Sequence, residues 1–179
     1  MSEPQDLLEE ALNDEYRKKY GLNIIFADKD KKPLEKGWDK WITKKQTDED
    51  VVLMYKDKHT NYGYFTGFNG LVAIDFDAAW VYLEALEYFG DRLNTFTVKT
   101  PNGGYHSYFI VKHPETYVQY KKTALHVEIL GNYNTIVHGT AQTVEGKTGK
   151  YEIINTEGIK EDESIIKDMK KFLRDTLTK

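Results

Sequence analysis

Two aspartates, Asp75 and Asp77, stand one residue apart at the end of the apolar segment 71–77. Alternate residues of a β-strand share a face, so in a strand these two carboxylates would lie side by side, opposite the apolar residues of the segment. Neighbouring carboxylates repel each other, and an unpaired buried charge is costly, so the pair suits a divalent cation such as Mg²⁺ or Mn²⁺. The same two residues also fit a strand that ends in solvent, with Asp77 as the N-cap of the next helix.

Further residues could add to this chemistry. Glu128 alternates with apolar residues in the segment 125–129 and could supply a third carboxylate, although a lone glutamate on a strand is ordinarily exposed. Gly103 and Gly104 come just before His106, and glycines let a backbone approach a phosphate closely while a histidine can donate to its oxygens. The glycines also fit an ordinary hairpin turn.

Taken together, these residue types indicate a site that handles phosphates with metal ions. Two cations about 3.5–4 Å apart can activate an attacking oxygen and stabilise the leaving one. Positioning and charge neutralisation would then supply most of the rate. The residue types alone do not separate nucleotidyl transfer from phosphodiester hydrolysis.

The elements that must position these residues form a mixed α/β pattern. Apolar spacing and N-cap signals predict helices at residues 6–20, 48–58, 78–89 and 162–177. Strands are predicted at 22–27, 62–66, 71–77, 95–99, 105–112, 125–130, 134–138 and 150–154. We expect three hairpins, which would pair 62–66 with 71–77, 95–99 with 105–112, and 125–130 with 134–138.

Composition narrows the class of protein. The chain has 179 residues, 40 % of them hydrophobic, so it can form a core. It has no cysteine, which excludes a disulfide scaffold, a thiol nucleophile and a cysteine zinc site, and fits a reducing intracellular setting. No apolar run approaches the roughly 20 residues that a membrane span needs. The net charge of −4 does not indicate a polyanion ligand, but phosphate recognition depends on local potential and bound cations.

The order of the motifs resembles the primase–polymerase (prim-pol) catalytic domains of the archaeo-eukaryotic primase superfamily, found in replication proteins of archaeal plasmids, viruses and phages. The resemblance covers roughly residues 20–140. The segments that carry it are Lys32-Pro33-Leu34 with Gly37-Trp38, Asn61–Gly67 followed by Gly70–Asp77, Thr100–Phe109, Val127-Glu128-Ile129 and Ile136–Thr140.

The resemblance implies a compact two-module prim-pol fold whose catalytic sheet is similar to an RNA-recognition motif and is flanked by helices. We therefore expect one catalytic domain over residues 1–179. Its N-terminal module would span about 1–60, its catalytic sheet about 61–155 and its C-terminal helix about 162–177.

The resemblance also implies roles for the site residues. Asp75, Asp77 and Glu128 would bind two Mg²⁺ or Mn²⁺ ions, and His106 would contact the triphosphate of the incoming nucleotide in a pocket that Gly103 and Gly104 shape. The implied partners are a DNA template and primer, dNTPs or NTPs, and a helicase or helical accessory domain outside this chain, with no membrane. A cytoplasmic protein of archaeal, bacterial, plasmid or viral origin would fit.

Two positions depart from the family pattern. Glu128 stands where many relatives carry aspartate, and either residue can bind a metal ion. Leu130 stands where many carry arginine, so one phosphate-binding charge is either missing or supplied by a lysine such as Lys99, Lys121 or Lys122.

The expected function is a template-directed nucleotidyltransferase, a DNA primase/polymerase. Two alternatives stay open at this point. One is a non-catalytic nucleic-acid- or nucleotide-binding replication domain, which would gain little from a cluster of negative charge. The other is a metal-dependent nuclease that uses the same carboxylates.

Overall fold

The computed structural model describes residues 4–32, 37–114 and 120–177, with the backbone alone described at 4–5 and 120–123. Pro33 and Leu34 of the expected Lys-Pro segment lie outside the described residues. The helices are α1 (Pro4–Leu12), α2 (Glu15–Tyr20), α3 (Asp48–Met54), α4 (Ala79–Phe89) and α5 (Glu163–Asp175), with the 3₁₀ turns η1 (Trp38–Ile42) and η2 (Phe68–Gly70). The strands are β1 (Ile24–Ala27), β2 (Asn61–Phe65), β3 (Leu71–Phe76), β4 (Thr97–Lys99), β5 (Tyr105–Ile110), β6 (Tyr120–Lys122), β7 (Val127–Leu130), β8 (Asn134–Gln142), β9 (Thr148–Asn155) and β10 (Lys160–Glu161).

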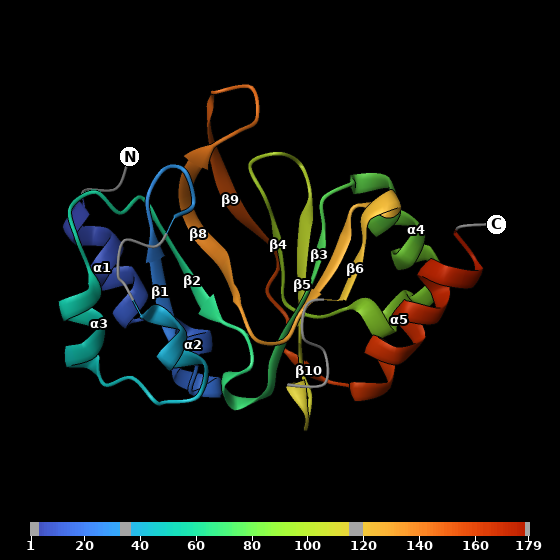
Figure 1. Cartoon of the computed structure of the whole chain (residues 1–179), viewed down its shortest axis with the longest axis horizontal. Coiled ribbons are helices and arrows are strands. Elements are labelled where there is room, and N and C mark those ends of the chain that lie inside the picture. The colour runs from blue at the N-terminus through green and yellow to red at the C-terminus, as the bar shows by residue number, and fades with distance from the viewer. Residues whose placement is uncertain (1–3, 33–36, 115–119, 178–179) are drawn as a thin grey trace.

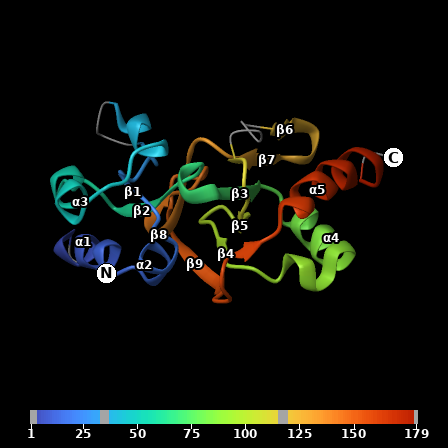
Figure 2. The ribbon, with the colours of Figure 1, turned by 90° about the horizontal axis from the view of Figure 1, so that it is seen from below.

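The strands form a curled sheet in the order β1-β2-β8-β9-β4-β5-β3-β7-β6, and β10 runs parallel beside β5. Helices α1–α3 lie at the β1 end and helices α4 and α5 at the other (Figures 1 and 2). This is the mixed α/β fold that the sequence predicts.

The antiparallel run β4-β5-β3-β7, with helix α4 directly after β3, is the part of the predicted segment 61–155 that resembles an RNA-recognition motif. Strands β2 and β8 of that segment pair with each other in the other half of the sheet, and the catalytic role stays a prediction. Helix α5 follows all four of these strands in the chain. It packs with α4 in one apolar cluster beneath them.

Apolar side chains gather in two cores along the sheet. The first lies between α1–α3 and the strands around β1, β2 and β8, and the second between α4, α5 and strands β3, β5 and β7. Val72, Ile74 and Phe76 point into the second core, which confirms the predicted alternation of β3. On its other face Leu71 and Ala73 belong to the first core, and Asp75 is the polar residue. None of the described helices is long and apolar enough to cross a membrane.

Two predicted helix boundaries were wrong. The segment 6–20 forms two helices, because Asp14 starts a new one by accepting a hydrogen bond from the Arg17 amide at 2.9 Å. Asp14 is also an acceptor for the hydroxyls of Tyr62 and Tyr64, so the break docks the helices onto β2. The second predicted helix ends at Met54, four residues early.

Two of the three predicted hairpins were also wrong. The pairing of β4 with β5 is confirmed, but β2 pairs with β1 and β8, and β3 pairs with β5 and β7. Strands β7 and β8 likewise lie in different halves of the sheet. The connections β2–β3 and β7–β8 cross between the halves side by side, and Thr66 and Tyr133 exchange hydrogen bonds there. The composition of a turn predicts that it connects two strands. Whether those two strands pair with each other depends on contacts with strands that are distant in the sequence.

Candidate active site

Three polar side chains occupy one row across neighbouring strands. Asp75 on β3 lies directly opposite His106 on β5 and directly opposite Glu128 on β7. Directly opposed residues have Cβ atoms about 4.5–5.5 Å apart on the same face. Asp77 follows β3, where its amide donates to the His126 carbonyl at 2.9 Å. Residues far apart in the sequence therefore lie side by side on one face of the sheet, and their catalytic and metal-binding roles stay predictions.

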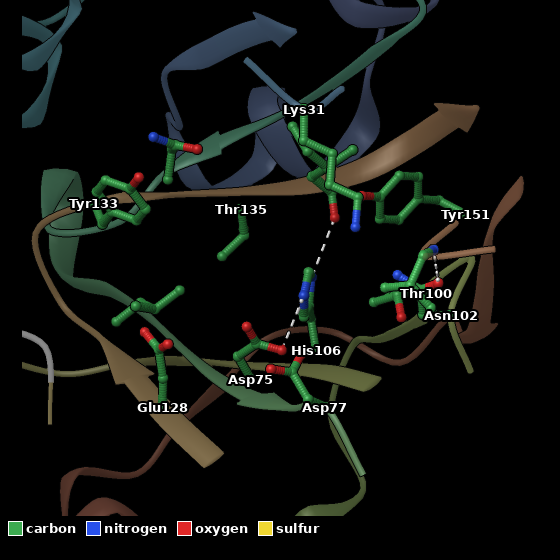
Figure 3. A pocket seen from close by; sticks show the side chains of 14 residues that line it. Lys31, Asp75, Asp77, Thr100, Asn102, His106, Glu128, Tyr133, Thr135 and Tyr151 are labelled. Carbon is green, nitrogen blue, oxygen red and sulfur yellow. Dashed lines mark hydrogen bonds and ion pairs between the residues drawn. The ribbon is translucent and has the colours of Figure 1, made fainter. Parts of the chain in front are cut away.

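The row forms one wall of a cavity of about 580 Å³ that lies between the two halves of the sheet (Figure 3). The residues that line the cavity are Lys31, Asp75, Asp77, Thr100, Asn102, His106, Glu128, Leu130, Tyr133, Asn134, Thr135, Ile136, Val144 and Tyr151. Lys31 and Tyr151 lie across the cavity from the carboxylates (Figure 3).

His106 and Asp75 form a partly buried ion pair. The Nε2 atom of His106 lies 3.3 Å from Oδ1 of Asp75, and the Nδ1–H of the same ring donates to the Ile136 carbonyl at 3.2 Å. Burial disfavours both charges, but the mutual attraction outweighs it, so the pKa of Asp75 is lowered and the pKa of His106 is raised. Both contacts favour the protonated ring, in which each nitrogen carries a proton.

Asp77 is the carboxylate whose repulsion by the neighbouring carboxylates is least compensated. Burial, followed by the charge of Asp75 and a hydrogen bond with it, raises the pKa of Asp77 to about 6. The charge of Glu128 acts in the same direction, while His106 opposes it. The carboxylates thus carry more negative charge at neutral pH than the neighbouring imidazolium balances.

These residues fit a hard divalent cation. Carboxylate oxygens are the ligands that Mg²⁺ and Mn²⁺ prefer, and Oδ1 of Asp75 is buried with no well-aligned hydrogen bond besides its ion-pair contact. Within the described parts of the chain, no three acidic or histidine side chains are already arranged as a ligand set. Oδ1 of Asp75 instead lies 3.3 Å from Nε2 of His106.

The glycine-rich turn positions the end of β3. Gly103 and Gly104 both use their amides inside the turn, donating to the carbonyl and the hydroxyl of Thr100 at 2.9 Å and 3.1 Å. A Cβ atom on Gly104 would lie 2.4 Å from the Phe76 carbonyl, so β3 passes too close for any side chain. The turn presents Thr100 and Asn102 to the cavity. The predicted nucleotide contact of Gly103 and Gly104 stays a prediction.

No local sequence signal identifies Lys31, the positively charged residue on the far wall of the cavity. Lys31 lies in the turn after β1 with a left-handed φ of 64°, and its amide donates to the Asp28 carbonyl at 2.9 Å. Of the predicted phosphate-binding lysines, Lys99 is not among the residues that line the cavity, and the side chains of Lys121 and Lys122 lie outside the described part of the chain. Only the three-dimensional fold brings the 28–32 turn opposite β3.

Comparison with known families adds one finding. The model of the family described as bifunctional DNA primase/polymerase, N-terminal (Prim-Pol), matches residues 13–165 of the 179. No curated protein matches the sequence. The matched range includes the whole row on β5, β3 and β7, together with Asp77 and Lys31.

Proposed function

Because the chain belongs to the bifunctional DNA primase/polymerase N-terminal domain family, we propose that it is a template-directed nucleotidyltransferase. It would use two divalent cations to add (deoxy)nucleotides to a primer or to an initiating nucleotide on a DNA template. The observation that supports this most is the position of Glu128, directly across from Asp75 on the same face of the sheet.

Asp75 and Asp77 would hold both cations, and Glu128 would complete the ligands of one. When bound, the cations would activate the attacking 3′-hydroxyl and neutralise charge on the leaving pyrophosphate. The 3′-oxygen forms a bond to the α-phosphorus, the bond from that phosphorus to pyrophosphate breaks, and the hydroxyl proton passes to solvent.

His106 and Lys31 would hold the triphosphate. The Nε2–H of His106 would donate to a phosphate oxygen in place of its contact with Asp75, which would free that carboxylate for a cation. The positive charge of Lys31 lowers the pKa of Asp75, so it acts across the cavity on this carboxylate. Its effect is smaller than those of burial and of the contacts with His106 and Asp77.

We also propose an intracellular location, where DNA and nucleoside triphosphates occur. A helicase or a helical accessory domain would be a partner.

A labelled primer–template incubated with Mg²⁺ or Mn²⁺, with and without triphosphates, tests the proposal. Lengthening only with triphosphates supports it. Shortening without triphosphates would identify a nuclease, and an unchanged primer would identify a binding module.

Asp75→Asn and Glu128→Gln should each slow extension by about 100-fold or more, because the cations they hold supply several kcal/mol of charge stabilisation. Glu84→Gln, on the exposed side of α4, is the matched control and should extend at the wild-type rate. Wild-type rates in both cavity variants would refute the metal assignment.

A further inference from the structure

An exposed aromatic ring stands at the rim of the cavity and has no part in the proposed chemistry. Tyr133 lines the cavity, and 42 % of the residue is exposed. Its amide donates to the Thr66 hydroxyl at 2.7 Å, and its carbonyl accepts from the Thr66 amide at 3.0 Å. Its ring meets Trp38 edge to face at 5.7 Å, and Trp38 stacks on Phe65 at the same centroid distance. The ring is therefore held in place while remaining open to a ligand.

A lysine-rich segment begins beside this ring. Lys40, Lys44 and Lys45 follow Trp38, all three are exposed, and Asp39 is the one acidic residue within 38–46. Residues 38–46 carry a net positive charge, although the whole chain has a net charge of −4. Asp48 and Asp50, at the start of α3, lie close enough for the charges of Lys45 and of Lys40 and Lys44 to act on them.

Packing orders this segment. The ammonium groups of Lys40 and Lys44 lie 4.8 Å and 5.8 Å from the centre of the Trp41 ring. The Asn23 side chain donates to the carbonyls of Trp41 and Lys44 at 2.8 Å and 2.7 Å, which fixes the backbone. The positively charged lysine side chains thus extend from a backbone that these contacts hold in place.

The segment that carries the ring and the segment that carries the lysines adjoin each other. A Cβ atom built on Gly67 would lie 2.7 Å from the Gly131 carbonyl and 3.0 Å from the Ile42 side chain, so η1, the β2–β3 connection and the β7–β8 connection meet there. Tyr133 stands at the end of the cavity that is opposite Thr100 and Asn102 (Figure 3). Segment η1 therefore adjoins the Tyr133 end of the cavity through the contact of Trp38 with Tyr133.

We infer that Tyr133, Trp38, Lys40, Lys44 and Lys45 form a track for single-stranded nucleic acid, with one base stacked on Tyr133 and the backbone phosphates beside the lysines. Aromatic platforms combined with a positive groove are how proteins hold single strands without reading sequence. The acidic wall of the cavity repels a polyanion, so the strand needs positive charge outside it. The inference rests on the proposed function in one respect, namely that this strand is the unpaired template.

The test is fluorescence anisotropy of a fluorescein-labelled dT12 strand in EDTA, over a series of NaCl concentrations. Tyr133→Ala should bind about 10-fold more weakly, since stacking on an aromatic side chain is worth about 1–3 kcal/mol per base. Tyr133→Phe, which keeps the ring, should bind like the wild type. The double variant Lys40→Ala/Lys44→Ala should flatten the slope of log K against log [salt] by about 1.4, or about 0.7 for each phosphate contact.

The matched control is Lys167→Ala/Lys171→Ala, which removes two exposed lysines from α5 at the far end of the molecule. It should leave both affinity and salt slope unchanged, and circular dichroism checks that all variants fold. Wild-type affinity in Tyr133→Ala or in Lys40→Ala/Lys44→Ala would overturn the inference, as would an equal loss in the control.

This experiment uses neither metal nor triphosphate, so its outcome is separate from that of the extension assay. A protein that extends primers but binds dT12 equally well in every variant keeps its proposed function and has no such track. A protein that binds through the track but extends nothing keeps the track and loses the proposed function.

Discussion

At the scale of single residues, the carboxylates of the site differ in how their charge is balanced. Asp75 has the His106 imidazolium at 3.3 Å, whereas Asp77 faces two further carboxylates and has its pKa raised to about 6. A metal ion would therefore relieve Asp77 more than Asp75. The two positions should respond in opposite directions when their charge is removed from the metal-free protein.

We expect Asp77→Asn to raise the melting temperature of the metal-free protein by about 2 °C at pH 8, a modest effect because solvent reaches part of the Asp77 side chain and screens its charge. The pKa of Asp77 is about 6 in the folded protein and 3.8 in the unfolded chain, so its stabilising contribution is complete below pH 3.8 and is lost as the pH rises through 6. Asp75→Asn should lower the melting temperature, because His106 loses its partner.

Differential scanning calorimetry in EDTA at pH 4.5 and pH 8 measures both effects. The gain from Asp77→Asn should shrink at pH 4.5, where the folded wild type already holds the proton. A gain that is equal at both pH values would mean that the substitution acts through packing and not through charge.

At the scale of secondary-structure elements, the β4–β5 turn and the end of β3 depend on each other. Gly104→Ala should lower the melting temperature by about 4–8 °C, because its Cβ would lie 2.4 Å from the Phe76 carbonyl and push the strand end that carries Asp77. Gly103→Ala meets no atom within 4 Å and should cost only about 1 kcal/mol, for its left-handed φ of 86°. Thermal melts and extension rates of both variants check this.

Gly103→Asn is a useful comparison with Gly103→Ala, because asparagine adopts a left-handed backbone more readily than alanine does. That variant should keep near-wild-type stability and extension. If Gly103→Ala reduced extension as strongly as Gly104→Ala without loss of stability, the Gly103 backbone would be in contact with the nucleotide.

The same elements show what could be predicted from the sequence. The two-residue period of β3 places Asp75 opposite the core, and Gly21 and Gly90 end helices where their left-handed backbone is needed, so local rules suffice for these features. The convergence with Glu128 rested on resemblance, because no local rule pairs β3 with β7. Lys31 and Tyr133 could not be found at all, since each stands in a turn that only the packing of distant strands brings to the cavity.

At the scale of the whole molecule, the cavity depends on how the two halves of the sheet are joined. Strand β9 pairs with β8 on one side and with β4 on the other. Side-chain contacts also cross between the halves, including the hydrogen bond of 2.6 Å between the hydroxyls of Tyr108 and Thr135 and the contact of His106 with Ile136. Since the carboxylates come from one half and Lys31 from the other, a movement between the halves would change the distance across the site.

Because these contacts join the two halves of the sheet, we predict that the chain unfolds as one unit. Measuring its unfolding also tests the expectation of a single domain. Ile25 is buried in the first core and Ile165 in the second. Ile25→Val and Ile165→Val each remove one methylene, which costs about 0.5–1.5 kcal/mol and should lower the melting temperature by about 2–5 °C. In calorimetry both variants should shift the same single transition, with a calorimetric enthalpy equal to the van't Hoff enthalpy. A second transition that moves in only one of the two variants would show that each half unfolds separately, so that the cavity between them could be lost while both cores remain folded.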